Sequence, residues 1–423
     1  MAKEHPTLFV GGLFDEQQRR EVQQWSTGPV QSAADALQWG YVRGLEADER
    51  ARVTVLSAPF LGSFPKRYRQ AWVPSRRFQR GSDGGDRVVG FLNLVGIKHI
   101  WRAVALSAAV RTWLRSVDDS PTIVAYAMTL PTVYSAWTAK LRRRDALVYL
   151  IIPDLPEFMD TSTSADPLRK ILKAAESGIL RTMTSRFNGQ ILLTKYMSER
   201  LPDIPHLVVE GIVSRETESS ETLQTSHVDP YPEERVLLYS GTLNRRYGVL
   251  RLCEAFRLLP DSSLRLVLCG SGDAEEEVRK HAEEDRRIIF KGQIPRDEVM
   301  MLQTHATVLV NPRMNNEAFA RYSFPSKIIE YMGAGRPVLC YKLDGIPDEY
   351  DQFLSYVPGS SIEDFAESIA RITSLPPSDL REQGERARQF VLTAKNPVAQ
   401  VRRVLDFCWG SRRPAADGAG RAS

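Results

Sequence analysis

The chain has 423 residues, which at about 100–200 residues per domain indicates two or three compact units. Hydrophobic residues make up 43% of the chain and charged residues 26%, so disordered, collagen-like and coiled-coil proteins are excluded. The net charge of +4 is unevenly divided, because residues 1–200 hold 28 Lys or Arg against 19 Asp or Glu, and the remainder holds 28 against 33.

Strands and helices are predicted to alternate through the first half of the chain. Short apolar runs that end in Gly, Pro, Ser or Asn are separated by helical stretches, a pattern typical of parallel α/β architecture. The predicted strands are Thr7–Val10, Val53–Ser57, Thr122–Tyr126, Ala146–Ile152 and Gly189–Thr194. Helices are predicted at Ser32–Gly44 and His99–Ser116.

Basic and aromatic side chains are interleaved between residues 64 and 80. A surface of this kind can face a nucleic acid, an anionic membrane or a phosphorylated acceptor, and an ordinary solvated surface explains it about equally well. No known nucleic-acid-binding module organises the basic residues, so nucleic acid is disfavoured. The residues concerned are Phe64, Lys66, Arg67, Tyr68, Arg69, Trp72, Arg76, Arg77, Phe78 and Arg80.

The alternation restarts after the polar segment 214–234, which is interpreted as a linker. Strands are predicted at Arg235–Ser240, Leu264–Cys269, Arg287–Phe290, Thr307–Val310 and Pro337–Cys340, and helices at Leu250–Leu259, Glu275–Glu284, Ser326–Met332 and Val398–Phe407. We therefore expect two doubly wound domains, 1–213 and 235–394, that face a central cleft. The segment 395–410 is expected to be a C-terminal helix, and the tail 411–423 to be disordered.

The cysteines and the apolar stretches bear on the compartment. Cys253, Cys269, Cys340 and Cys408 lie far apart without zinc-ligand spacing, which argues against a disulfide framework and fits a reducing cytosol. No apolar stretch approaches the ~20 residues of a bilayer span, and the N-terminus lacks a secretory signal pattern. A cytoplasmic protein is expected.

The segment Val308–Val338 carries the strongest candidate site. A strand and a polar loop lead into a helix that opens at Ser326 and Lys327 after Pro325, so the free backbone N–H groups of Ser326, Lys327 and Ile328 are predicted to bind an anion such as a phosphate. One turn later, the carboxylate of Glu330 is placed to accept hydrogen bonds from a ribose diol. A simple i,i+3 ion pair between Glu330 and Lys327 is the alternative interpretation, and it is favoured for an isolated motif.

Two further glycine-bearing turns follow strands of the same predicted sheet. Gly241 comes after Arg235–Ser240, and the nearby Arg245 or Arg246 is a candidate for clamping a diphosphate. Gly270 follows Leu264–Cys269. Each turn alone is a weak signal, but all are expected to converge on the carboxyl edge of the sheet.

These motifs, in the order SGTLNRRYG, LVLCGSGD, FKGQIP, SFPSKIIEYMGAGRPVL and DGIPDEY, resemble the nucleotide-sugar half of bacterial family-4 glycosyltransferases of the GT-B fold, polysaccharide-assembly members in particular. The likeness is clear over about residues 235–410 and looser in the first half, at FVGGLF, IIPDLPEFM, ILLTKYMSERL and VVEGIV. The resemblance implies a retaining transferase, with the nucleotide sugar bound by the C-terminal domain and the acceptor by the N-terminal domain. It also implies a C-terminal helix that returns to the N-terminal domain.

The resemblance assigns roles residue by residue. Glu330 matches the second glutamate of the family's E-x7-E motif, which binds ribose hydroxyls, and Ser326 and Lys327 match the residues that meet the diphosphate. Gly241 and Arg245 or Arg246 fall at the phosphate clamp, and Gly270 follows in the next loop of that sheet. Ile294 falls where the nucleobase is met, and Gly11 and Gly12 match the glycine loop that faces the phosphates and the acceptor.

The sequence departs from the family pattern at three places. The first glutamate of E-x7-E is replaced by Tyr322, and Glu317 or Asn316 is a hypothetical substitute from the same loop. The glycine-arginine pair reads Gly241-Thr242, which moves the clamp to Arg245 or Arg246. The N-domain histidine has no match, and Tyr126 ends the corresponding strand. The donor sugar is therefore not predicted, although UDP is the expected nucleotide.

No D-x-D triplet occurs, so we expect a reaction that uses no metal and no other cofactor, with charge neutralised by Lys, Arg and backbone N–H groups. Lys327, Glu317 and Asp154 are the candidate catalytic residues, Asp154 as the group that orients the acceptor; a turn-forming role ahead of Pro156 is equally compatible with its position.

Two other classes stay open: a nucleotide-sugar epimerase of the same fold, and a non-catalytic binder of nucleotide sugars or glycans. The acceptor is expected to be a glycan, a lipid-linked glycan or a small molecule. The basic N-terminal half suits peripheral contact with an anionic inner membrane face.

Overall fold

The computed structural model describes residues 4–28, 30–80, 85–157, 167–213, 234–316 and 319–410. The chain divides into two compact units. Unit 1 comprises Met1–Glu210 together with Pro397–Ser423, and unit 2 comprises Gly211–Asn396. Apart from Glu234, the predicted linker 214–234 lies outside the described residues, as does the predicted tail 411–423.

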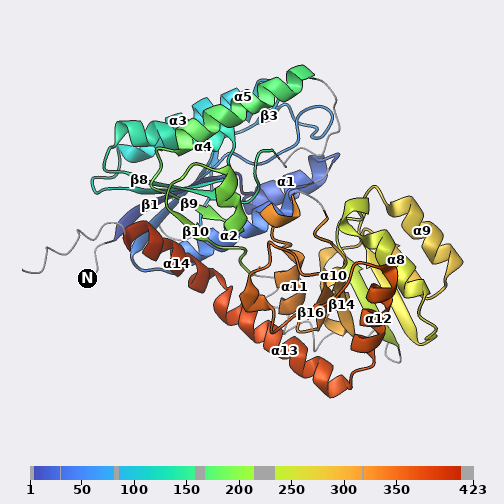
Figure 1. Cartoon of the computed structure of the whole chain (residues 1–423). Helices are drawn as coiled ribbons and strands as arrows, with labels where there is room; N and C mark the ends of the chain where they lie inside the picture. Colours follow the sequence, from blue (N-terminus) through green and yellow to red (C-terminus); the bar gives the residue numbers. More distant parts are fainter. Residues whose placement is uncertain are drawn as a thin grey trace, which may run out of the picture. The chain divides into compact units, whose positions relative to one another are not determined.

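Unit 1 is built on an eight-stranded sheet in the order β10-β9-β8-β7-β1-β2-β5-β4 (Figure 1). Its neighbouring strands pair in parallel except β4 and β5, which are antiparallel. The strands are β1 (His5–Gly11), β2 (Ala51–Ser57), β4 (Arg76–Arg77), β5 (Arg87–Val88), β7 (Thr122–Tyr126), β8 (Leu147–Ile152), β9 (Gly189–Leu192) and β10 (His206–Val208). The sheet changes direction between β1 and β7, which is where doubly wound sheets bind ligands.

Helices cover both faces of this sheet. On one face α4 (Leu130–Arg142) packs between α3 (Lys98–Leu114) and α5 (Pro167–Thr184), and on the other α2 (Ser32–Glu46) packs against α14 (Pro397–Gly410). Strand β7 is buried along its whole length and β8 from Val148 onward, which explains their apolar composition.

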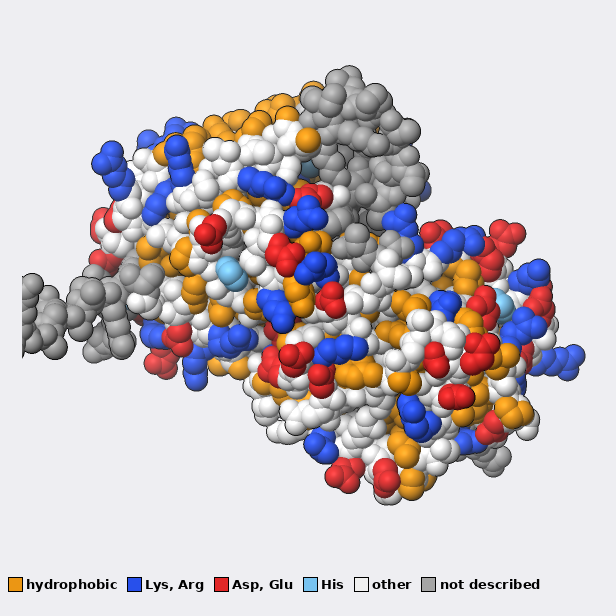
Figure 2. All heavy atoms as spheres, in the orientation of Figure 1, with side chains coloured by type: hydrophobic (Ala, Val, Ile, Leu, Met, Phe, Trp, Pro, Cys, Tyr) orange, Lys and Arg blue, Asp and Glu red, His pale blue; other side chains and the backbone are white. Residues whose placement is uncertain are grey.

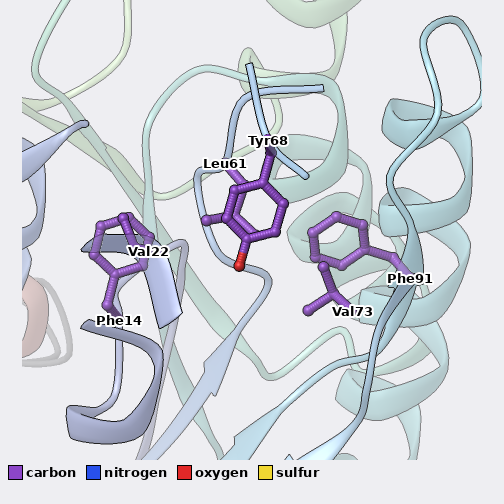
Figure 3. Close-up of a cluster of buried hydrophobic side chains, with 6 residues drawn as sticks. All are labelled: Phe14, Val22, Leu61, Tyr68, Val73 and Phe91. Carbon is purple, nitrogen blue, oxygen red and sulfur yellow. The ribbon is translucent and has the colours of Figure 1, made fainter. Parts of the chain in front are cut away.

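A second apolar cluster closes the end of unit 1 near α1 (Glu16–Trp25). Figure 3 shows its six buried side chains pointing toward one another, and they include Tyr68 from the aromatic and basic segment. Beside it, β3 (Trp72–Val73) and β6 (Phe91–Leu92) form a small antiparallel ribbon. The cluster consists of Phe14, Val22, Leu61, Tyr68, Val73 and Phe91.

The C-terminal helix α14 belongs to unit 1, as the resemblance implied. The Tyr149 hydroxyl donates to the Cys408 carbonyl over 2.8 Å, and the Tyr149 ring meets Phe407 edge-to-face. Gly44 of α2 lets α14 approach closely, because a Cβ at this position would lie 2.2 Å from the Pro397 carbonyl oxygen. The helix therefore completes the core of a unit whose other elements all precede residue 211.

Unit 2 contains a six-stranded parallel sheet in the order β13-β12-β11-β14-β15-β16, the arrangement of a Rossmann fold. The strands are β11 (Arg235–Ser240), β12 (Leu264–Cys269), β13 (Ile288–Gly292), β14 (Val308–Asn311), β15 (Val338–Cys340) and β16 (Ser355–Tyr356). The helices are α8 (Val249–Arg257), α9 (Glu275–Glu284), α10 (Arg296–His305), α11 (Lys327–Gly333), α12 (Ile362–Thr373) and α13 (Pro377–Ala394). The α/β class and both doubly wound sheets are confirmed.

The four cysteines are buried free thiols. Within the described residues, no helix combines the length and the apolar composition that crossing a bilayer requires.

Candidate active site

Three glycine loops meet at the carboxyl edge of the sheet in unit 2. The Gly241 N–H donates to the Cys269 carbonyl and the Gly270 N–H to the Gly292 carbonyl, over 2.9 and 2.8 Å. Gly270 has a φ of +134°, and a Cβ there would lie 1.8 Å from the Gly241 oxygen. Only glycine fits this crossing. The expected convergence of the loops after β11 and β12 is therefore confirmed.

The loop after β14 joins them on the other side of β11. Gly248, which ends the 3₁₀ turn η2 (Arg245–Tyr247), has a φ of +80°, and a Cβ there would lie 2.3 Å from the Pro312 oxygen. Since β11 and β14 flank the point where the sheet reverses direction, these loops surround the position where a Rossmann sheet binds its ligand.

Lys327 and Glu330 form an ion pair at this edge. The Lys327 Nζ lies 3.0 Å from each Glu330 carboxylate oxygen, and its Cε would lie 3.5 Å from a Cβ on Gly241. The Glu330 side chain is only 19% exposed. The i,i+3 pair is therefore real, but it lies beside the glycine loops rather than on an open surface.

A buried glutamine holds the Glu330 carboxylate in place. The Gln303 Nε2 of α10 donates to Glu330 Oε1 over 2.8 Å and to the Ser240 hydroxyl over 2.9 Å. Sequence reasoning missed Gln303, because it lies in the last turn of a helix with no motif around it. Its signal is visible only in the structure, as a polar side chain 2% exposed that links β11 to α11.

Opposing effects act on the pKa of Glu330. Burial by itself would raise it. The charge of Lys327, the hydrogen bond from Gln303 and the charge of Arg296 outweigh burial, so the pKa lies below its ordinary value. Glu330 is therefore a carboxylate at neutral pH, with acceptor oxygens for hydroxyl donors.

The start of α11 differs from the sequence prediction. The helix begins at Lys327, with the exposed Ser326 as its N-cap, and the Ile328 N–H donates to the Pro325 carbonyl over 2.8 Å. The prediction that the Ile328 N–H is free to bind an anion is therefore wrong. This N–H closes a tight turn after proline, which sequence spacing does not reveal.

The two candidate clamp arginines differ in their surroundings. The Arg245 guanidinium forms an ion pair with Glu277, while its backbone N–H donates to Asp273 Oδ1 over 3.0 Å. The Arg246 side chain is exposed, and its backbone N–H donates to Asn244. Glu277 therefore engages the side chain of Arg245 and not that of Arg246. Ile294 lies partly buried between β13 and α10, at the same edge of the sheet.

Arg313 is a further buried cation at this edge. It directly follows β14 and Pro312, is 8% exposed, and its guanidinium stacks on the rings of Tyr247 and Phe319 at 5.5 and 4.8 Å. No role was predicted for Arg313 from the sequence. Tyr322 is buried, and Glu317 lies outside the described residues.

In unit 1, side chains of the protein itself pack against the Gly11–Gly12 loop. The Gly12 N–H donates to Gln38 Oε1 over 2.7 Å, and a Cβ on Gly12 would lie 2.3 Å from the Phe60 ring. A Cβ on Gly11 would lie 2.3 Å from the same Gln38 oxygen. These glycines thus allow Gln38 and Phe60 to pack against the backbone, and the Gly12 N–H is already engaged within the protein.

Tyr126 and Asp154 end neighbouring strands of unit 1. Tyr126 is fully buried, and its hydroxyl has no hydrogen-bond partner among the described residues. Burial raises the pKa of Tyr126 well above its ordinary value, and the charge of Asp154 raises it further. Asp154 is exposed just beyond β8. The structure brings both to the carboxyl edge next to the Gly11–Gly12 loop.

No group of three or more His, Cys, Asp or Glu side chains within the described ranges is placed to share a metal ion. The charged groups at this edge of unit 2 include Lys327, Glu330, Arg246 and Arg313.

Comparison with known families finds a match to part of unit 2. Residues 223–390 match the family described as glycosyl transferases group 1. The matched segment lies within unit 2. A search of curated proteins finds no match.

Solved structures match nearly the whole chain. A sucrose-phosphate synthase from Thermosynechococcus elongatus is 15% identical with a TM-score of 0.61, over 97% of this chain and 99% of that one. A UDP-forming trehalose-phosphate synthase from Burkholderia xenovorans, in complex with glucose-6-phosphate, is 11% identical with a TM-score of 0.65, over 96% and 100%. Anabaena HepE in complex with UDP is 14% identical with a TM-score of 0.58, over 95% and 98%. At these identities the likeness shows the fold, which is GT-B.

Proposed function

We propose that the protein is a glycosyltransferase of the family-4 type that moves a sugar from a nucleotide diphosphate sugar to a glycan, lipid-linked glycan or small-molecule acceptor. The observation that carries the proposal is the Lys327–Glu330 pair, held by Gln303 beside converging glycine loops within the segment that matches glycosyl transferases group 1. UDP is the proposed nucleotide, supported by the UDP named with HepE and with the trehalose-phosphate synthase.

Each charged group has a proposed role in binding the donor. The ionised Glu330 accepts hydrogen bonds from the ribose hydroxyls, because its pKa keeps it a carboxylate and Gln303 fixes its orientation. Lys327, Ser326 and Arg246 face the diphosphate, and Gly241 and Gly270 let the backbone approach it. Ile294 meets the nucleobase. Positive side chains at the diphosphate stabilise the charge that develops as it departs.

The proposed reaction retains the configuration at the anomeric carbon and uses no metal ion. The bond between the anomeric carbon and the diphosphate oxygen breaks, and the acceptor oxygen bonds to that carbon on the same face. The acceptor proton passes to the departing diphosphate. Asp154, which is exposed, is proposed to orient the acceptor. Tyr126, which is fully buried, and Glu317 remain predictions from the sequence alone. Positioning is then the main contribution of the protein.

A non-catalytic binder of nucleotide sugars is the second candidate. Tyr322 favours it, because a buried tyrosine stands where the family places a glutamate that grips the donor sugar. Release of nucleoside diphosphate that requires an added acceptor distinguishes the transferase from this binder and from an epimerase.

The first test is a thermal-shift screen against UDP-, GDP-, ADP- and dTDP-sugars in EDTA. We expect stabilisation by one nucleotide series, which at a ligand concentration of about a hundred times Kd amounts to about 2.7 kcal/mol. Glu330→Ala should abolish the shift. Glu284→Ala, which removes a surface partner of Arg257 in the same unit, should preserve it. No shift with any series would refute the proposed donor site.

A further inference from the structure

An exposed apolar patch covers the start of α3. Five large hydrophobic side chains between residues 95 and 104 are 43–73% exposed, although such side chains are usually buried. Trp72 of β3 is 51% exposed and meets the Trp101 ring edge-to-face at 6.2 Å. In Figure 2 hydrophobic side chains gather along the upper edge of unit 1, where Figure 1 draws α3 and α5. The α3 patch comprises Trp72, Val95, Ile97, Ile100, Trp101 and Val104.

The patch follows the helical period. Ile97, Ile100, Trp101 and Val104 are three or four residues apart, so they share one face of α3. The opposite face, which includes Leu106 and other apolar residues, is buried against the rest of unit 1. In the first turns the buried face carries Lys98, Arg102 and Ala103, so the large apolar side chains there lie on the exposed face.

The surroundings of the patch are basic. Residues 51–117 contain 12 Lys or Arg and only two acidic residues, Asp83 and Asp86. The basic segment predicted from the sequence is only partly a surface, however, because Arg76 pairs with Asp15 and Glu21.

Arg80 is engaged in the same way, with Asp86 and Glu46, and Tyr68 lies in the core cluster of Figure 3. Lys66, Arg67 and Arg69 remain exposed.

These three basic residues lie beside the patch. The loop that carries them is tied to the segment before α3, because the Phe64 N–H donates to the Asn93 carbonyl over 3.0 Å and the Asn93 N–H donates to the Ala71 carbonyl over 2.7 Å. The first turns of α3 are anchored at the carboxyl edge of the sheet, where the Lys98 Nζ donates to the Leu61 carbonyl.

We propose that the α3 patch docks on an anionic lipid bilayer, with Lys66, Arg67 and Arg69 at the headgroups. Exposed tryptophan and aliphatic side chains on one helix face, bordered by basic residues, are the features by which amphipathic helices bind the membrane interface. The absence of acidic residues from 87 to 117 removes the repulsion that an anionic surface would exert. The docking face lies at the same edge of unit 1 as Gly12 and Tyr126, so a lipid-linked acceptor would reach that edge from the bilayer.

The test is co-sedimentation of the full-length protein with vesicles of phosphatidylcholine, with and without phosphatidylglycerol. No nucleotide sugar is added, so the outcome is independent of the transferase proposal. We expect binding to the anionic vesicles at low salt. The double variant Ile100→Ser, Val104→Ser should weaken it by about tenfold or more. Leu258→Ser, which alters a similarly exposed side chain of unit 2, should leave it unchanged.

Charge variants test the headgroup contact. Arg67→Gln and Arg69→Gln should each weaken binding to anionic vesicles roughly fivefold, since a basic residue near such a surface contributes about that factor. Arg402→Gln, an exposed arginine of α14, should not. Equal binding by all variants, or no binding to anionic vesicles, would overturn the proposal. So would a dimer in sedimentation velocity that the Ile100→Ser, Val104→Ser variant dissociates, because the patch would then bind a second copy of the chain.

Discussion

Ala127 holds a backbone conformation that side-chain-bearing residues rarely adopt, with a φ of +72° between β7 and α4. Its N–H donates to the Ile151 carbonyl over 2.9 Å, and its carbonyl accepts from the Thr132 hydroxyl over 2.6 Å. These bonds hold the strained turn directly after Tyr126. Strained backbone of this kind is kept where the surroundings determine it, often beside functional residues.

Replacing Ala127 with glycine should therefore stabilise the fold. The left-handed conformation costs an alanine roughly 1–2 kcal/mol, of which the greater freedom of glycine in the unfolded chain cancels part. We expect Ala127→Gly to raise the free energy of unfolding in urea by about 0.5–1 kcal/mol. Ala139→Gly, inside helix α4, should lower it. A loss of stability in Ala127→Gly would show that the backbone at Ala127 is not strained.

Lys98 is a buried ammonium whose titration is coupled to stability. Burial lowers its pKa to about 8, and the positive charges of Arg102 and Arg67 add to the effect. The unfolded chain keeps this proton until its pKa of about 10.5. Between these values the unfolded state binds more protons than the native state, so the free energy of unfolding rises with pH in that window.

Lys98→Met should remove this slope. The free energy of unfolding of wild type and variant is measured by urea unfolding from about pH 7 to pH 9.5. We expect the wild type to gain stability relative to the variant as pH rises, by at most about 3 kcal/mol. Other titrating groups are common to both proteins and cancel in the difference. A difference that is constant with pH would show that Lys98 keeps its ordinary pKa.

Among the elements, the loops that follow β11 and β12 are the most constrained. Their contact leaves no room for a side chain at Gly270. The φ of +134° at Gly270 is a second, independent reason for glycine, because residues with a side chain rarely adopt it. The candidate donor site depends on this crossing, because the Gly241 backbone lies next to the Lys327 side chain.

We expect Gly270→Ala to lower the free energy of unfolding by about 2–4 kcal/mol and to weaken nucleotide-sugar binding. Gly178→Ala is the matched control, since a Cβ on this glycine of α5 meets nothing within 4 Å. It should raise stability by about 0.5–1 kcal/mol. Urea unfolding and thermal shift measure both effects. If Gly270→Ala behaves like the control, the loops do not cross as described.

The long central elements could be predicted from the sequence, and the polar contacts of the site could not. Strands Thr122–Tyr126, Arg235–Ser240 and Leu264–Cys269 are observed as predicted, because a buried parallel strand is a nearly continuous apolar run. The two-residue strands β3 to β6 were missed, since they are too short for a period to appear.

Contacts between residues distant in sequence left no local signal. Gln303 supports Glu330 from another helix, Gln38 occupies the Gly12 N–H, and Glu277 engages the Arg245 side chain. Such pairs arise only when the sheet brings separate loops together. The sequence therefore located the edge where the site lies but not the partners within it.

At the scale of the whole molecule, the chain passes from unit 1 to unit 2 after Glu210 and returns after Asn396. Near the two crossings, the Val213 N–H donates to the Lys395 carbonyl over 2.8 Å. The returning helix α14 then packs on α2 and Tyr149.

Ending the chain after Asn396 should destabilise unit 1, because it uncovers the surfaces of Tyr149 and α2 that α14 buries. We expect a lower melting temperature for unit 1, measured by calorimetry, and increased aggregation, measured by light scattering. A chain that ends after Gly410 keeps α14 and should melt like the full protein. If both truncations melt alike, α14 does not contribute to the stability of unit 1.

The return of α14 also has a consequence for biosynthesis. Residues up to Glu210 leave the ribosome first, yet their fold is completed only by residues made after the whole of Gly211–Asn396. At about 5–20 residues per second, that interval lasts on the order of 10–40 s. During this interval the α2 face that α14 later covers is bare. Unit 2 comes second in the sequence, yet it is the first unit to have all its elements synthesised.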